Sequence, residues 1–244
     1  MDVFRALLHD SAEAGQARDA AAHRALLDRD DGWAVGPLVV GDERLAGLDP
    51  DVAVSVLTSG GAGSVAALAR RSGALRLAAV ETVLRDLDDL GGNAARVVAA
   101  AAELGDGVDV FVGIPAGSGT VDAVEVVEAA GLLGRLDLTG HRGAAEQLSV
   151  LVEADLPFKA TGLGADTFGS YGVVAVLMAV EALVDGADAQ DAEQLLAEPD
   201  ETRSRNALAA WDDALQARVR RRLRGVDSVA VASTLDELTE AGLL

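Results

Sequence analysis

The chain contains no cysteine, so disulfides, thiolate nucleophiles and cysteine-ligated metals are excluded. Histidine is scarce as well, and His9, His23 and His141 are too far apart in the sequence to form a metal-binding motif. No G-x-S-x-G nucleophile elbow occurs, which leaves a hydrolase triad without support. We therefore expect neither a metal nor a cofactor.

Positive charge is also scarce, with 20 basic residues against 40 acidic ones and a formal net charge of −20. Such a surface repels nucleic acid and anionic lipid, so neither is an expected partner. The one basic run, Arg218–Arg224, has no aromatic residues within it, and we interpret it as the charged end of a helix.

Long apolar runs are missing. The longest, Gly172–Val180, is much shorter than the roughly 20 residues that cross a bilayer. The first residues lack the basic head and apolar body of a signal peptide. We expect a cytoplasmic protein with no membrane partner.

Aromatic residues make up only 3% of the chain, whereas half of it is hydrophobic, so the core must consist of Ala, Val and Leu. A chain of 244 residues is within the range of a single barrel domain, and we expect one domain over residues 1–244. Alanine-rich segments such as Ala94–Leu104 could pack closely against a second copy, which suggests a homo-oligomer.

Short β-branched runs alternate with Ala- and Leu-rich stretches of helical spacing, a pattern typical of parallel β/α units. The predicted strands are Trp33–Val40, Val52–Thr58, Leu75–Glu81, Val108–Ile114, Leu136–Thr139, Pro157–Thr161 and Ser228–Ala232. The predicted helices between them include Ser64–Arg71, Gly92–Leu104, Val121–Leu133 and Ala144–Glu153. A helix over about residues 10–28 is expected to precede the first strand.

These segments give seven strands, and residues 172–224 read mostly as helix: Val173–Val184, Ala189–Leu196 and Arg205–Arg224. We expect an α/β fold, a (β/α)8 TIM-like barrel that is incomplete or distorted if the eighth strand is short or lost in that region. The alternative is a doubly wound open parallel sheet. Closure of the sheet between its first and last strands distinguishes the two.

Lys159 is the single lysine, beside 19 arginines. Arginine is always protonated, whereas a buried lysine can lose its proton and act as a nucleophile or base. Retaining an ammonium only here therefore points to chemistry at this position. The alternative is a general bias toward arginine that left one lysine by chance.

Alternation along the predicted strands places Lys159 and Thr161 on one face, and Asp137 and Thr139 on the same face of the preceding strand. Their polar face would look into the barrel near the carboxyl ends, where barrel sites lie. Glu81 and His141 follow or end strands at the same mouth. A structural ion pair between Lys159 and Asp137 is the competing interpretation.

Two glycine-rich breaks follow strands and open helices, Thr58–Ser64 and Ile114–Thr120. Neither is a P-loop or a G-x-G-x-x-G motif. Free N–H groups at a helix start can hold an anion, so Gly60, Gly61, Gly63 and Ser64 are candidate anion-binding residues. Ordinary glycine turns capped by Ser64 or Thr120 account for the same pattern.

The stretch Pro157–Leu163 resembles the P-F-K-A-T-A-G-L-H-H strand of an uncharacterised bacterial family with a barrel-like pattern. Trp33–Val40 is similar to that family's W-M-L-G-R-F-V-V segment, and Val110–Pro115 to its V-F-V-E-I-P segment. Leu138–His141 stands where the family has R-T-G-G, and the ending Ala241–Leu244 also fits. The resemblance implies a barrel but carries no known activity.

This chain departs from the family at most of its polar positions. The paired histidines are replaced around Gly164, Ala165 and Asp166, the glutamate by Gly113 and the arginine by Leu138. Ala232 and Ser233 stand where the family has an acidic pair. The lysine is kept while much of the polar ring is changed.

Lys159-Ala160-Thr161-Gly162 also resembles the K-T-S-T-G segment of deoxyribose-phosphate aldolases, whose Schiff-base lysine lies on the sixth barrel strand. Counting from Trp33–Val40, Lys159 lies on the sixth strand as well. Those enzymes carry a further lysine on the next strand, which is absent here.

Two functional hypotheses follow. In the first, Lys159 forms a Schiff base with a small carbonyl compound in a class I aldolase-type lyase, Asp137 transfers protons, and Thr139 and Thr161 bind substrate hydroxyls. In the second, the barrel is non-catalytic, a ligand binder or a partner subunit, and Lys159 serves only as a cation. The expected partner is a small-molecule ligand.

Overall fold

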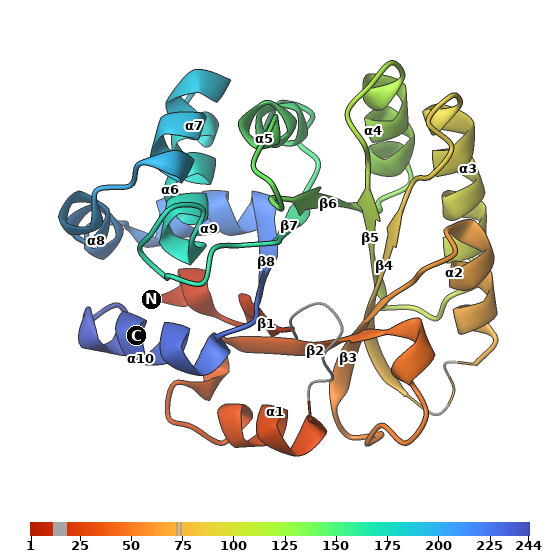
Figure 1. Cartoon of the computed structure of the whole chain (residues 1–244), viewed down its shortest axis with the longest axis horizontal. Helices are drawn as coiled ribbons and strands as arrows, with labels where there is room; N and C mark the ends of the chain where they lie inside the picture. Colours follow the sequence, from red (N-terminus) through yellow and green to blue (C-terminus); the bar gives the residue numbers. More distant parts are fainter. Residues whose placement is uncertain (12–18, 72, 74) are drawn as a thin grey trace.

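The computed structural model of the chain describes residues 1–11, 19–71, 73 and 75–244. Eight parallel strands pair in chain order, and the last returns to the first, so the sheet is a closed barrel (Figure 1). The strands are β1 (Leu8–Asp10), β2 (Val35–Gly41), β3 (Ala53–Leu57), β4 (Arg76–Val83), β5 (Asp109–Gly113), β6 (Leu133–Asp137), β7 (Phe158–Thr161) and β8 (Leu223–Ser228). The expected (β/α)8 TIM barrel is confirmed, and the open doubly wound sheet is wrong.

Helices alternate with the strands and surround the barrel (Figure 1). They are α1 (Ala20–Leu27), α2 (Ala62–Ala69), α3 (Leu90–Ala101), α4 (Thr120–Ala129), α5 (Ala144–Glu153), α6 (Val173–Val184), α7 (Ala189–Ala197), α8 (Glu201–Ala209), α9 (Asp213–Arg222) and α10 (Val231–Glu240). Short 3-10 turns are η1 (Asp2–Phe4), η2 (Gly32–Ala34) and η3 (Asp42–Arg44).

The strand missing from the sequence prediction is β1, which pairs with both β2 and β8. It is only three residues long and includes two polar side chains, His9 and Asp10, so it gives no apolar period of two. An eighth strand within residues 172–224 was therefore the wrong expectation, because that region forms helices α6 to α9. The predicted helix over residues 10–28 is shorter, since Asp10 belongs to β1 and α1 begins at Ala20; residues 12–18 lie outside the described residues.

Two strand boundaries also differ from the prediction. Strand β6 starts at Leu133 instead of Leu136, and β8 ends at Ser228, where the predicted strand began. Both strands carry charged residues, Arg135 at the centre of β6 and Asp227 next to the last residue of β8. Charged residues inside a strand mask its apolar period, which shifts the predicted strand toward the apolar residues beyond them.

The predicted helix over residues 205–224 consists of two helices, α8 and α9. The Asp212 side chain caps α9 by accepting a hydrogen bond from the Leu215 N–H at 2.8 Å. The basic run does end this helix, with Arg220, Arg221 and Arg222 in its last turn, as expected.

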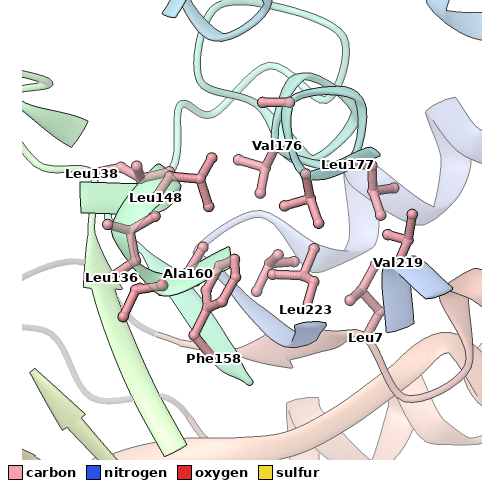
Figure 2. Packing of buried hydrophobic residues seen from close by; sticks show 14 of the residues in the cluster. Leu7, Leu136, Leu138, Leu148, Phe158, Ala160, Val176, Leu177, Val219 and Leu223 are labelled. Atoms are coloured by element: carbon pink, nitrogen blue, oxygen red, sulfur yellow. The ribbon is translucent and has the colours of Figure 1, made fainter. Parts of the chain in front are cut away.

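The main core lies between the outer face of the strands and the helices. Phe158 and Ala160 of β7 are fully buried and face α6, which contributes Val176 and Leu177 (Figure 2). Burying a side chain such as Phe158 stabilises the fold by roughly 1.5–3 kcal/mol. This apolar face fixes β7, and alternation then forces Lys159 and Thr161 to the opposite, inner face.

Alanine-rich α3 packs within the chain. Ala94, Val97 and Ala100 are buried, and the helix lies against α2 and α4. The expected homo-oligomer stays a prediction. Across the described part of the chain, no helix has the length and apolar character needed to span a membrane.

Candidate functional site

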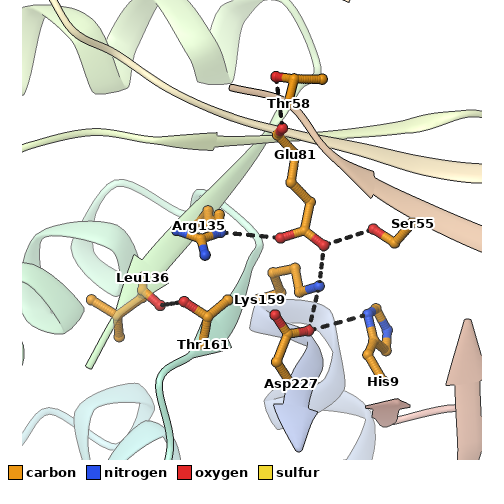
Figure 3. A network of polar contacts seen from close by, with 9 residues as sticks. All are labelled: His9, Ser55, Thr58, Glu81, Arg135, Leu136, Lys159, Thr161 and Asp227. Carbon is orange, nitrogen blue, oxygen red and sulfur yellow. Dashed lines mark hydrogen bonds and ion pairs between the residues drawn. The ribbon is translucent and has the colours of Figure 1, made fainter. Parts of the chain in front are cut away.

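Lys159 lies inside the barrel between two carboxylates (Figure 3). Its Nζ is 2.6 Å from Glu81 Oε1 and 2.6 Å from Asp227 Oδ1, and the side chain is completely buried. The residues come from β7, β4 and β8, so only closure of the barrel brings them together. The ring centre of Phe111, on β5, is 5.5 Å from the ammonium and lies on an apolar layer with Ala79 and Leu133.

Glu81 connects Lys159 to two further side chains. Ser55 Oγ donates to Glu81 Oε1 at 2.7 Å, and Arg135 Nε donates to Glu81 Oε2 at 3.0 Å. Both carboxylate oxygens are therefore occupied. Arg135 and Lys159 are paired neighbours in the β6–β7 register, so their side chains leave the sheet side by side toward the same acceptor.

His9 of β1 completes the network from the opposite side. Its Nδ1 lies 3.9 Å from Asp227 Oδ1. The imidazole fits because Gly36 on β2 and Gly225 on β8 leave room for it; a Cβ on either glycine would overlap the ring. Burial lowers the pKa of His9 well below its ordinary value, and the charge of Lys159 lowers it further, so His9 is neutral at pH 7.

The two carboxylates have opposite pKa shifts. Burial favours the neutral acid in both, but the charges of Lys159 and Arg135 outweigh it at Glu81 and hold its pKa at about 2. At Asp227 burial prevails, with the charge of Glu81 adding to it against Lys159, and the pKa rises to about 6. Burial would lower the pKa of Lys159, but Asp227 and Glu81 together raise it above its ordinary value.

Directly above this network a cavity of about 920 Å³ opens at the carboxyl ends of the strands. Its lining includes three arginines and three carboxylates: Arg44, Arg85, Arg135, Glu43, Asp137 and Asp227. Arg135 and Asp227 form part of both the network and the cavity wall, with side chains 12% and 10% exposed. Lys159 and Glu81 do not line the cavity, because both are completely buried beneath it.

Three of the predicted site residues, Asp137, Thr139 and Thr161, line this cavity. Asp137 does not pair with Lys159; its Oδ1 accepts a hydrogen bond from the Thr139 N–H at 2.9 Å. The Thr161 hydroxyl donates to the Leu136 carbonyl at 3.3 Å. Glu81, proposed from the sequence as a mouth residue, is instead the direct partner of Lys159.

The other predicted residues lie apart from the cavity lining. His141 is exposed, and its ring stacks on Tyr171 with the ring centres 3.7 Å apart. None of the predicted anion-binding residues, Gly60, Gly61, Gly63 and Ser64, contributes to the lining. Just before them, Ser59 N–H donates to Asp42 Oδ2 at 3.1 Å, so a carboxylate of the chain already accepts from this loop.

Sequence reasoning did not single out Arg135, Asp227, Ser55 or His9 as site residues. A usable signal existed for two of them. With β6 starting at Leu133, Arg135 shares a face with Asp137, and with β8 starting at Leu223, Gly225 and Asp227 share the inner face. His9 carried no comparable signal, since β1 is so short.

The aldolase resemblance loses its positional support, because Lys159 lies on the seventh strand once β1 is counted. Among the residues that the structure describes, no group of three or more His, Cys, Asp or Glu side chains is arranged to hold a metal ion. Neither a protein-family model nor a curated protein matches the chain. The TIM-barrel fold rests on the closed sheet of the structure. The resemblance to the uncharacterised family stays a prediction.

Proposed function

We propose that this barrel binds a small molecule in the cavity at the carboxyl ends of its strands, and that Lys159 is a fixed cation beneath the site. The observation that carries the proposal is the division of the charged groups. Lys159 is sealed between Glu81 and Asp227, whereas Arg135 and Asp227 present polar atoms to the cavity. A cavity of this size with a few convergent polar groups is the usual form of a ligand site.

A Schiff-base lyase is less well supported. A lysine attacks a carbonyl carbon only as the neutral amine. Two carboxylates 2.6 Å from Nζ favour the ammonium, and they raise the pKa of Lys159. The amine also lacks access, because the side chain is fully buried and does not line the cavity.

Trapping tests this directly. The protein is incubated with a panel of small aldehydes and ketones and reduced with borohydride, and the modified residue is located by peptide mass spectrometry. We expect no adduct at Lys159. A saturable adduct at Lys159, competed by a ligand that binds the cavity, would overturn its assignment as a fixed cation and restore the lyase.

A second candidate is acid–base catalysis by Asp227. Its carboxyl group lines the cavity, and its pKa of about 6 is near neutrality, where a group gives and takes protons most effectively. On a carbonyl compound, the carboxylate would remove a proton from the carbon beside the carbonyl. The C–H electron pair would move into the carbonyl to form an enolate, and returning the proton to carbon would regenerate the carboxylate.

Exchange in D₂O measures this step. Small keto- and hydroxy-carboxylates are followed by proton NMR for loss of the C–H signal with wild-type protein and with Asp227→Asn. Exchange that requires Asp227 supports catalysis. Equal exchange with both proteins, or none above the protein-free rate, leaves ligand binding as the function.

A further inference from the structure

The charge of the cavity differs from that of the molecule as a whole. The chain has twice as many acidic as basic residues, 40 against 20, yet the cavity lining has three arginines and three carboxylates. Two of those carboxylates already have cationic partners: Glu43 lies 3.3 Å from Arg44, and Asp227 lies 2.6 Å from Lys159. Unlike the chain as a whole, the lining therefore has no excess of acidic over basic residues.

Arg135 has donors left over. Its Nε is held by Glu81, and it has no other hydrogen bond or ion pair with the residues that the structure describes. A guanidinium carries five N–H donors in a planar fork, so the terminal nitrogens of Arg135 remain available at the cavity wall. The Nε contact fixes the orientation of the fork, which reduces the entropy lost when a ligand binds.

Arg85 reaches the same cavity from the loop after β4. Its guanidinium has no ion pair within the described part of the chain. The loop is fixed by Asn93, whose Oδ1 accepts from the Arg85 N–H at 2.8 Å and from the Asp86 N–H at 3.2 Å. The backbone of Arg85 is thereby held in place, while the N–H donors of its guanidinium remain available to a ligand.

We infer that the cavity takes a small molecule with a carboxylate or phosphate group, which Arg135 binds through its terminal nitrogens and Arg85 attracts from the rim. This rests on the proposed ligand-binding function and adds the chemical class of the ligand. Arginine forks suit both carboxylate and phosphate because both present pairs of oxygens. The hydroxyl of Thr139 and the carboxylate of Asp137, both in the lining, are left to contact the remainder of the molecule.

Binding of simple probes tests the inference. Acetate, succinate, inorganic phosphate, glycerol and methylammonium are titrated into isotopically labelled protein, and the arginine Nε–Hε and backbone NMR signals are followed. We expect the anions, and not glycerol or methylammonium, to shift the signals of Arg135 and of the cavity lining. The ratio of the succinate to the phosphate affinity distinguishes a carboxylate ligand from a phosphate ligand.

Variants identify the residues responsible. Arg135→Gln should weaken anion binding at least tenfold, and Arg85→Gln by about threefold to tenfold, consistent with loss of one charge-assisted contact. Arg85 is exposed, so its variant keeps the fold even if Arg135→Gln is destabilised. Arg70→Gln is the matched control, because Arg70 is an exposed residue at the end of α2, pairs with Glu103 and does not line the cavity.

The outcomes separate the two proposals. Glycerol or methylammonium binding in the cavity while anions do not would overturn the ligand class and leave the proposed function intact. Anion binding that is unchanged in both Arg135→Gln and Arg85→Gln would overturn the assignment of these residues. No probe bound at the cavity at millimolar concentration would count against the proposed function itself.

Discussion

The sealed interior of the barrel and the cavity above it contain neighbouring cations in contrasting settings. Lys159 and Arg135 are paired across β7 and β6, and both contact Glu81. Lys159 is completely buried, with a carboxylate on either side, whereas Arg135 is 12% exposed and keeps its terminal nitrogens at the cavity wall. Two cations that are direct neighbours in the sheet therefore differ in role: Lys159 belongs to a buried ion pair, and Arg135 is a candidate ligand contact.

The difference shows that the rarest charged residue of the chain, Lys159, is not the one that is available to a ligand. A solitary lysine draws attention as a nucleophile, yet Lys159 is completely buried between two carboxylates and does not line the cavity, so a ligand there does not reach its amine. Arg135 is one of 19 arginines and is inconspicuous in the sequence. It is chemically available because its side chain reaches the cavity wall, whereas that of Lys159 does not.

The largest expected effect comes from removing the sealed cation. Lys159→Met leaves Glu81 and Asp227 buried without their shared counter-ion, and we expect a loss of about 3–5 kcal/mol in the free energy of unfolding. Urea denaturation measures it. Arg70→Met, which breaks an exposed pair with Glu103, should cost less than about 1 kcal/mol. Similar small losses in both variants would contradict the structural role of Lys159.

The free energy of unfolding should fall at acidic pH because of Glu81. Its pKa is about 2 in the folded protein against an ordinary 4.5, so the native state binds its proton less tightly than the unfolded state. The stability this provides is present above about pH 4.5 and is lost as pH falls toward 2, amounting to about 3 kcal/mol. Unfolding of wild type and Glu81→Gln is compared across that range. A wild-type loss no steeper than that of the variant would show that Glu81 is not held ionised.

Lys159→Arg tests why an arginine-rich chain has lysine here. A guanidinium is larger than the completely buried ammonium that it would replace, so we expect a loss of about 1–3 kcal/mol, less than for Lys159→Met because the charge is kept. The matched change Arg135→Lys, at the wall of an open cavity, should cost less. Denaturant midpoints and slopes measure both. An arginine tolerated at position 159 without loss would indicate that the lone lysine is accidental.

The smallest effect is expected at the carboxylate that the sequence favoured. Asp137 is exposed, and among the described residues its side chain accepts a hydrogen bond only from the Thr139 N–H, which an asparagine side chain can also accept. Asp137→Asn should change the free energy of unfolding by less than about 0.5 kcal/mol. Asp227→Asn removes one of the two negative charges beside Lys159, and its loss in the free energy of unfolding should be several times larger. A larger loss of stability in Asp137→Asn than in Asp227→Asn would contradict the assignment of Asp227, and not Asp137, as a partner of Lys159.

Much of the fold was predictable because most strands show their apolar faces. Val110 and Val112 of β5 alternate with inward residues, and Phe158 and Ala160 do the same on β7, so the parallel β/α pattern follows from the sequence. The failures, β1 and the ends of β6 and β8, fall where polar residues enter the barrel interior. Local apolar periodicity cannot indicate a strand whose inner face is polar and whose length is three residues.

By itself, the sequence determined that helices cover parallel strands and that Lys159 faces inward, since both follow from the local periods of apolar side chains. Only the tertiary structure decided which acid partners that lysine and which cation remains available. Glu81, Lys159 and Asp227 lie on β4, β7 and β8, far apart in the chain, and meet because β1 closes the sheet. Closure depends on strand count and register, which no single segment encodes.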